Sequence, residues 1–275
     1  MSSLEILKDY DVVGNYSQDE VNGFSNDVIP TLINAVIDFY PKTLLDCMAG
    51  DGNLGQRCLE TFAERKVPAP EMQVLEFSRV QSEIAKARLA QWNSTVWTGD
   101  ILTMATHDGE PLFTENMFDC IMIKSANHEI PLASQLQMYS QLFRILKPGG
   151  LFINLGFAFE DEKARDEVRH LAQCKDSLAG LHGAAANRYF LMKDEFYAFL
   201  QNAGFNGIRP LKTFNYNISA DRVGKNYFPT ERAKYQAFKN AVASSAHLKE
   251  NGFIESKGTD LAFLARGEIT IAFKP

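Results

Sequence analysis

The sequence predicts an α/β fold in which a doubly wound, mostly parallel sheet is covered by helices on both faces. Three observations lead to this prediction. Short apolar segments of strand length alternate with amphipathic segments of helix length. The apolar segments are nearly continuous, as expected of parallel strands buried on both faces. A glycine-rich loop follows the first of them and opens a helix, which is typical of doubly wound sheets that bind a ligand.

The expected elements alternate regularly up to about residue 157. An apolar stripe with helical spacing predicts a helix over 26–39, which Pro41 ends. Later helices are expected from Leu54, over 79–91, and over 134–146, where Ser134 is placed to cap the helix. Lys147-Pro148-Gly149-Gly150 is expected to stop that helix and form a turn. The expected strands in this part of the chain span 43–47, 72–77, 95–98, 118–123 and 151–155.

After residue 157 the alternation changes. Helices are expected over 160–178 and 192–203, and strands over 208–216 and 268–273. The segment between these two strands is too long for a turn, so we expect an insertion, with a helix over 230–249, that covers one edge of the sheet. A single domain with five parts is predicted. They are an N-terminal flap and helix (1–40), a donor-binding core (41–157), helices and a late strand (158–217), an insertion or lid (218–260) and the last strand (261–275).

Composition limits the possible partners and compartments. The 28 basic and 34 acidic residues give a formal charge of −6, which argues against a nucleic-acid partner. The four cysteines are scattered without a Cys-x-x-Cys pair, as expected of reduced thiols rather than of disulfides or a zinc site. No secretory signal and no apolar run of about 18 residues is found, so a cytoplasmic protein without a membrane partner is expected.

The loop after the first strand, Gly50-Asp51-Gly52-Asn53-Leu54-Gly55, fits the pattern G-x-G-x-x-G. Two ligands compete for such a loop, a dinucleotide and S-adenosylmethionine. A pyrophosphate beside Asp51 would place like charges together, and Asp46 adds a second acid at the end of the strand. Both acids would favour a ligand with a sulfonium and an ammonium group. The loop therefore favours the methyl donor.

The segment from Leu44 to Gly52 resembles the first motif of the class I S-adenosylmethionine-dependent methyltransferases, with Met48 where that family usually has a glycine. The resemblance extends over about 43–157 and includes the turn at Lys147-Pro148-Gly149-Gly150. It implies a seven-stranded Rossmann-like sheet whose last strand is antiparallel. It also implies that Glu76 holds the ribose hydroxyls, that Asp100 pairs with the adenine amino group, and that Ile101 packs on the ring. The cofactor-binding residues expected on this basis are Asp46, Gly50, Asp51, Gly52, Glu76, Phe77, Asp100, Ile101 and Lys124.

Two of these carboxylates also have simpler structural explanations. Asp100 can cap the turn that follows it, as an aspartate after glycine often does. Glu76 can be a solvated strand end. Asp119, at the start of the fourth strand, is expected to order the turn before that strand rather than to contact a ligand.

The loop after the fourth strand, residues 124–130, is the expected place for a catalytic group. His128 is the best candidate for a general base or a group that orients the acceptor. The structural alternative is that His128 packs against the next helix and hydrogen-bonds to a backbone carbonyl. Lys124 occupies the position where a metal-dependent enzyme would need an acid, so no metal is expected. Residues that could contact the acceptor are Tyr16, His128, Tyr189, Tyr216 and Tyr227.

The function predicted from these features is in-line methyl transfer from S-adenosylmethionine to a small-molecule acceptor, which leaves S-adenosylhomocysteine. The loop after the fourth strand lacks the Asn/Asp-Pro-Pro-Tyr/Phe motif of enzymes that methylate amines of nucleic-acid bases, and the acceptor atom, O, N or C, stays open. Two alternatives remain. One is a noncatalytic domain that binds S-adenosylmethionine or serves as a scaffold. The other is an NAD-dependent oxidoreductase, which Asp46 and Asp51 disfavour.

Overall fold

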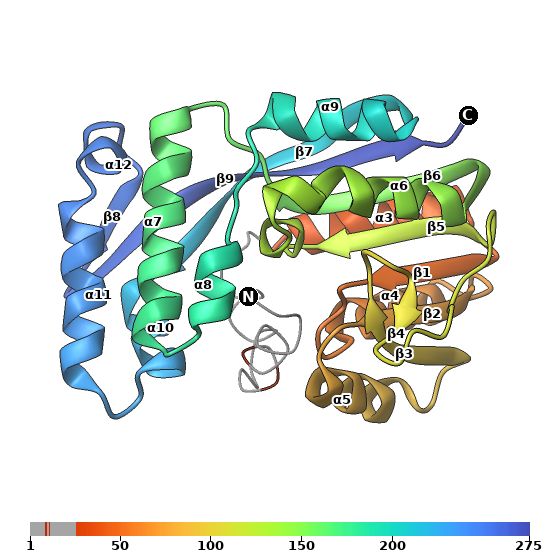
Figure 1. The fold of residues 1–275 in the computed structure, drawn as a ribbon, viewed down its shortest axis with the longest axis horizontal. Coiled ribbons are helices and arrows are strands. Elements are labelled where there is room, and N and C mark those ends of the chain that lie inside the picture. Colours follow the sequence, from red (N-terminus) through yellow and green to blue (C-terminus); the bar gives the residue numbers. More distant parts are fainter. Residues whose placement is uncertain (1–8, 10, 12–25) are drawn as a thin grey trace.

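The computed structural model describes residues 9, 11 and 26–275 (Figure 1). In this part of the chain, nine strands form one sheet in the order β4-β3-β2-β1-β5-β6-β9-β7, and β8 pairs with β9. Strands β1, β2, β3, β5 and β6 are parallel, and β9 runs antiparallel to both of its neighbours, β6 and β7. The strands are β1 (Thr43–Cys47), β2 (Glu71–Glu76), β3 (Ser94–Asp100), β4 (Ala105–Thr106), β5 (Phe118–Lys124), β6 (Leu146–Phe157), β7 (Asn206–Ser219), β8 (Ile254–Lys257) and β9 (Asp260–Phe273).

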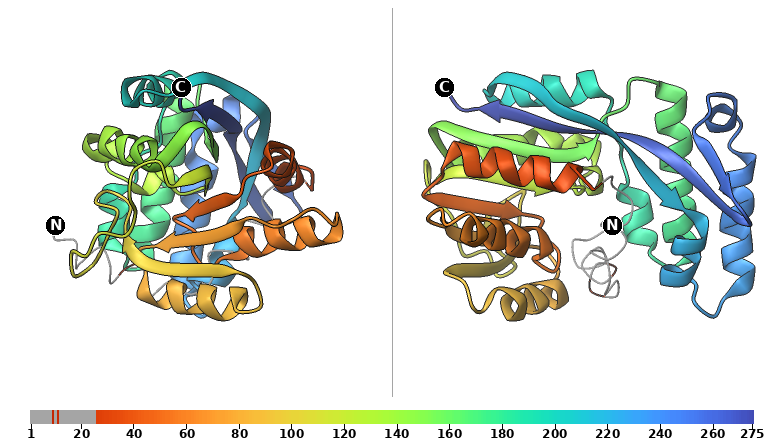
Figure 2. Two further views of the ribbon diagram at one scale, coloured as in Figure 1. Left: turned by 90° about the vertical axis from the view of Figure 1, so that its right-hand side faces the viewer. Right: turned by 180° about the vertical axis from the view of Figure 1, so that it is seen from behind.

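Helices cover both faces of the sheet, as Figure 2 shows. Alternate strand residues point to opposite faces, so Leu44 belongs to the core under α3 and α4, and Leu45 to the core under α6 and α9. The helices are α3 (Val28–Phe39), α4 (Asn53–Glu64), α5 (Arg79–Leu89), α6 (Gln135–Ile145), α7 (Glu162–Leu178), α8 (His182–Asn187), α9 (Lys193–Ala203), α10 (Ala220–Tyr227), α11 (Arg232–Ser244) and α12 (Ala246–Glu250). The predicted mostly parallel α/β fold is confirmed.

A second layer of structure lies beyond the main sheet, on the left of Figure 1. We call it the accessory lobe; it comprises α7, α8, α10, α11, α12 and β8, with the adjoining parts of β7 and β9. Its apolar core is separate from the two cores of the main sheet. Strand β9 serves both regions, because Phe263 and Ala265 belong to the core of the accessory lobe, and Ile269 and Ile271 to a core of the main sheet.

Several expected elements differ from the observed ones. Seven strands match the expected sheet, and the short β4 and β8 are additional. The helix expected over 230–249 breaks at Ser245 into α11 and α12, and α8, α10 and β8 were not expected. Lys147-Pro148-Gly149-Gly150 lies within β6 rather than in a separate turn. Ser134 occupies the N-cap position of α6, but its side chain makes no capping hydrogen bond, so the predicted cap is wrong.

Asp119 joins three strands of the main sheet. Its Oδ2 accepts hydrogen bonds from Lys42 N (3.0 Å), Thr43 N (2.9 Å) and Thr43 Oγ1 (3.0 Å), and its Oδ1 accepts one from Lys147 Nζ (2.8 Å). Burial alone would raise the pKa of Asp119, but the hydrogen bonds from Lys147 and Thr43 outweigh it and lower the pKa below its ordinary value. Asp119 therefore ties the starts of β1, β5 and β6 together, in agreement with the structural role expected for it.

Asp119→Ala is expected to lower the free energy of unfolding by about 2 kcal/mol at pH 7, because it removes a group of hydrogen bonds to a carboxylate. Since the folded-state pKa is depressed, this contribution is complete above the ordinary carboxyl pKa of about 4 and is lost as the pH falls below it. Urea denaturation at pH 7 and at pH 3 measures both effects, with Asp108→Ala at an exposed loop position as control. Equal destabilisation at the two pH values would contradict the assignment.

Candidate active site

A cavity lies at the edge of the sheet where β1, β2, β3 and β5 end, so the loops that follow these strands line it. Asn187, the last residue of α8, adds a contribution from the accessory lobe. Seven of the nine residues expected to bind the cofactor line this cavity: Gly50, Asp51, Glu76, Phe77, Asp100, Ile101 and Lys124.

Asp46 and Gly52 do not line the cavity. Asp46 is 1% exposed, and the backbone N–H of Gly55 in the first turn of α4 helps to stabilise its carboxylate. Burial raises the pKa of Asp46 to about 7, although Lys124 acts against this rise. Gly52 has φ +75°, and a Cβ at this position would lie 3.1 Å from Cβ of Ala85 in α5. Both residues therefore lie on the side of the glycine-rich loop that faces away from the cavity, where they support the loop and the packing of α4.

The loop after β1 has a left-handed backbone at two cavity-lining residues, Met48 (φ 54°) and Gly50 (φ 57°). Glycine adopts this conformation without strain, whereas a residue with a Cβ does so at a cost. This backbone geometry explains why a glycine suits the position that Met48 occupies. The side chain of Met48 adds an apolar group to the cavity wall.

Glu76, at the end of β2, holds two loops together. Its Oε2 accepts a hydrogen bond from Gly50 N (2.7 Å), and its Oε1 accepts one from Ser78 N (2.8 Å). Burial raises the pKa of Glu76 to about 7, against the opposing effect of these two N–H groups. A carboxylate offers about four acceptor positions, so the two backbone contacts leave capacity for hydroxyl groups of a ligand.

The carboxylate of Asp51 is paired with Arg88 of α5. Arg88 Nη2 lies 2.6 Å from Asp51 Oδ2, and Arg88 Nε donates to the backbone oxygen of Asp51 (2.8 Å). The same carboxylate accepts a hydrogen bond from Asn53 N (3.2 Å) at the start of α4. Asp51 therefore fixes the loop against α4 and α5, and its charge has a counter-ion within the protein.

Asp100, at the end of β3, orders the turn that follows it, because its Oδ1 accepts a hydrogen bond from Leu102 N (2.8 Å). This turn is the structural alternative considered for Asp100. The same residue lines the cavity together with Ile101 and Leu102. The turn and a ligand contact are compatible, because an aspartate has two carboxylate oxygens.

The loop after β5 forms the opposite wall of the cavity. Ser125 (φ 53°), Ala126, Glu129, Ile130 and Pro131 line it. The fully buried Gln135, the first residue of α6, donates from Nε2 to the backbone oxygens of Asn127 (2.8 Å) and Ile130 (2.7 Å). A single side chain thus holds both ends of the segment that contains His128 and Glu129.

Glu129 begins a chain of ion pairs that reaches the accessory lobe. Its Oε1 lies 2.9 Å from Arg188 Nη1, and Arg188 Nε lies 2.8 Å from Asp176 Oδ2 of α7. Asp176 also pairs with Lys175. Burial alone would raise the pKa of Asp176, but Arg188 and Lys175 outweigh it and lower the pKa to about 2. Charges of alternating sign therefore connect the cavity wall with α7.

His128 does not line the cavity. Its ring stacks on Phe190 (centroid distance 4.8 Å, interplanar angle 11°) and meets Phe157 edge-on (5.1 Å). Burial, and next the positive charge of Arg188, lower the pKa of His128 well below its ordinary value. The backbone oxygen of His128 accepts a hydrogen bond from Tyr189 N (2.9 Å). The imidazole is neutral at pH 7 and lies in an aromatic cluster beside the cavity.

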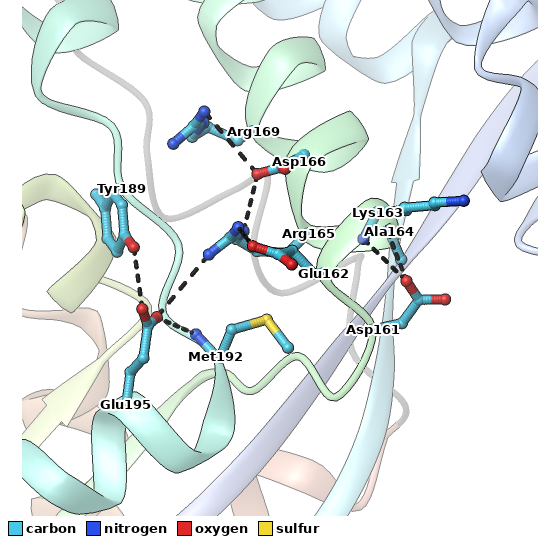
Figure 3. Close-up of polar contacts among 10 residues, drawn as sticks. All are labelled: Asp161, Glu162, Lys163, Ala164, Arg165, Asp166, Arg169, Tyr189, Met192 and Glu195. Atoms are coloured by element: carbon cyan, nitrogen blue, oxygen red, sulfur yellow. Dashed lines mark hydrogen bonds and ion pairs between the residues drawn. The ribbon is translucent and has the colours of Figure 1, made fainter.

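Three of the four tyrosines expected to contact the acceptor, Tyr189, Tyr216 and Tyr227, do not line the cavity. Tyr189 Oη donates to Glu195 Oε1 (3.2 Å) within the polar network of Figure 3, in which Arg165 pairs with Asp166 (2.9 Å). The ring of Tyr216 lies 5.8 Å from that of Phe157, and Lys175 Nζ lies 4.0 Å from the ring centroid of Tyr227. Tyr16 is outside the described residues.

Two described N-terminal residues contact both sides of the cavity region. Asp9 Oδ2 accepts hydrogen bonds from Gly183 N (2.6 Å) and Ala184 N (3.0 Å) in α8. Asp11 Oδ1 accepts one from Oγ of Ser78, which lines the cavity (2.7 Å). These contacts link the accessory lobe with the start of α5.

Sequence reasoning missed Glu129 and Arg88 as residues of the site, and it missed the ion pair that Arg188 makes with Glu129. Glu129 follows His128 in the loop that was expected to be catalytic, so its position was a usable signal. The two arginines lie on α5 and just after α8, and their partners are 37 and 59 residues away in the sequence. No local pattern indicates such pairs.

Comparisons with known proteins agree with the fold. Residues 56–154 match the family model described as a methyltransferase domain. No curated protein sequence matches the chain. Across residues 26–275 and positions 9 and 11, no helix is long and apolar enough to cross a membrane.

Three solved structures share the fold. A protein of Bacillus halodurans described as a methyltransferase has 17% identity and a TM-score of 0.72, covering 91% of this chain and 100% of its own. The YcgJ protein of Bacillus subtilis has 16% identity and a TM-score of 0.69, and the match covers 88% of this chain and 97% of YcgJ. A phosphoethanolamine N-methyltransferase of Haemonchus contortus, in complex with S-adenosylhomocysteine, has 14% identity and a TM-score of 0.58, covering 98% and 60%.

The domain match shows that the chain contains a methyltransferase domain, and the structural likeness, at identities of 14–17%, shows the shared fold. The cavity combines a carboxylate that can accept hydrogen bonds from a diol with apolar side chains that can pack against an aromatic ring.

Arg88→Met is expected to lower the free energy of unfolding by about 2 kcal/mol, because it leaves the largely buried carboxylate of Asp51 without this counter-ion. Chemical denaturation measures the change. Lys86→Met is the matched control on the same helix, since Lys86 pairs with Glu83 at the surface and should contribute less than about 0.5 kcal/mol. Equal effects of the two substitutions would contradict a structural role for the pair of Asp51 and Arg88.

Proposed function

We propose that this protein transfers the methyl group of S-adenosylmethionine to a small-molecule acceptor. The observation that carries the proposal is the cavity at the carboxyl ends of β1, β2, β3 and β5, where Glu76 and the left-handed loop at Gly50 meet. When bound, the cofactor supplies a methyl group that is already activated by its attachment to a sulfonium. The protein then has to orient the two reactants and exclude water.

The proposed arrangement follows the order of the strands. Glu76 at the end of β2 accepts hydrogen bonds from the ribose hydroxyls, and Asp100 at the end of β3 accepts one from the adenine amino group. Ile101 packs on the adenine ring, and Phe77 and Gly50 complete the wall. Asp46 and Gly52 support the loop from behind, Asp51 is paired with Arg88, and Lys124 lines the cavity and acts electrostatically on Asp46.

The acceptor is proposed to enter between the loop after β5 and the accessory lobe. Phe157, Phe190 and the ring of His128 form an aromatic cluster next to this loop. The relative from Haemonchus contortus was solved with phosphomonomethylethanolamine, a small molecule, which supports the same class of acceptor here. We keep His128 as the candidate general base or orienting group, because its neutral imidazole is the form that accepts a proton.

The proposal is tested by incubating the full chain with S-adenosylmethionine labelled in its methyl group and with fractionated small-molecule extracts. Label is expected in a product of low molecular mass, together with S-adenosylhomocysteine. Binding of S-adenosylhomocysteine without any transfer would favour a noncatalytic binding domain. Binding of NAD without binding of S-adenosylhomocysteine would overturn the proposal.

The affinity for S-adenosylhomocysteine is expected to fall as the pH is lowered through about 7, because protonation of Glu76 removes acceptor capacity from the ribose site. If only the ionised form binds, the association constant decreases about tenfold between pH 8 and pH 6. Calorimetric titration of the wild type measures this decrease. In Glu76→Gln, binding should be weaker by about 1–3 kcal/mol and its pH dependence should be smaller. Unchanged affinity in the variant would contradict the ribose assignment.

His128→Phe separates the two roles of His128, because phenylalanine preserves the stacking on Phe190 but has no ring nitrogen. If His128 accepts a proton, kcat should fall about 100-fold or more, and the pH profile of kcat should change. The melting temperature should stay close to that of the wild type. An unaltered rate profile, measured with the acceptor found by labelling, would give His128 a purely structural role.

A further inference from the structure

We propose that Glu129 recognises the positive charge of the methyl donor, so that this cavity distinguishes S-adenosylmethionine from its neutral product. The inference deepens the proposed function, because it rests on the donor-binding role of the same cavity. S-adenosylmethionine has a sulfonium, whereas S-adenosylhomocysteine has an uncharged thioether at the same position. A carboxylate near that sulfur would stabilise the first ligand and not the second.

The order of the strands places the sulfur on the side of the cavity where Glu129 lies. Adenine is assigned to the end of β3 and ribose to the end of β2, and the sheet continues with β1 and then β5. The sulfur is attached to the ribose on the side opposite the adenine. In this arrangement the sulfur would lie near the loops after β1 and β5, and Glu129 of the loop after β5 lines the cavity.

The other charged residues of the cavity wall have different partners or positions. Asp51 pairs with Arg88, and Asp100 orders its own turn at the far end of the sheet. Glu76 accepts hydrogen bonds from two backbone N–H groups at the ribose position. Lys124 interacts electrostatically with Asp46, beneath the loop after β1.

Contacts with Arg188 and Gln135 fix the position of Glu129 in the cavity wall. Its side chain is 18% exposed, that of Arg188 is 5% exposed and that of Asp176 is fully buried. Glu129 lines the cavity, whereas its partner Arg188 does not. The negative end of the ion-pair chain therefore faces the ligand, and Gln135 fixes the backbone on either side of Glu129. Arg188 and Gln135 are positioning residues in this arrangement.

The test compares the dissociation constants of S-adenosylmethionine and S-adenosylhomocysteine, measured by calorimetry on the wild type and on Glu129→Gln in the absence of acceptor. Glutamine has the same shape and can still accept a hydrogen bond from Arg188, but it is uncharged. The ratio of the constant for S-adenosylhomocysteine to that for S-adenosylmethionine is expected to fall about fivefold in the variant, mainly because S-adenosylmethionine binds more weakly.

Two further variants make the result specific. Glu76→Gln should weaken both ligands equally and leave the ratio unchanged, because the ribose is common to both. Glu129→Asp retains the charge on a shorter side chain, so its ratio should lie between those of the wild type and Glu129→Gln. This variant also keeps the test open if Glu129→Gln does not fold.

An unchanged ratio in folded Glu129→Gln would overturn the inference and leave the donor site intact. The same holds if Glu129→Gln weakens both ligands equally. Failure of the wild type to bind either ligand would instead overturn the proposed function, and with it the role of Glu129. The two failures are therefore distinguishable from one set of titrations.

Discussion

A carboxylate can line a partly dry cavity only if the protein supplies a counter-charge or hydrogen-bond donors for it. This constraint governs the whole site. Glu76 is satisfied by backbone N–H groups, Asp51 by Arg88, Asp100 by its own turn and Glu129 by Arg188. Each of these contacts also fixes a loop of the cavity wall. The interactions that stabilise the buried carboxylates therefore also determine the shape of the cavity.

Much of the fold and the position of the site could be predicted from local sequence patterns. The continuous apolar segment at 43–47 became β1 with the same bounds, and the glycine-rich loop after it lines the cavity. Glu76 and Asp100 could be found because parallel strands end at one edge of the sheet, so that residues following neighbouring strands come together. These inferences use only short-range periodicity and one topological rule.

The rest depends on contacts that no local pattern encodes. Asp46 stands where the donor-binding motif has an aspartate. Its side chain is buried under the loop, near the backbone of Gly55, and does not line the cavity. The ion pair of Glu129 and Arg188 forms because α8 folds back against the loop after β5, and that arrangement follows from the accessory lobe. Residue type alone suggested the tyrosines as acceptor contacts, because the sequence does not show how their segments pack, and the rings of Tyr216 and Tyr227 make other contacts.

The uninterrupted path of β9 limits how the protein can deform (Figure 2). Its backbone is paired with β7 from Ala262 to Phe273, across the boundary between the two cores. A hinge needs a short segment in which only a few backbone hydrogen bonds change. Strands β7 and β9 are paired across the boundary between the two cores, so they contain no such segment there. Any relative movement of the two cores therefore requires the paired strands to twist as a ribbon.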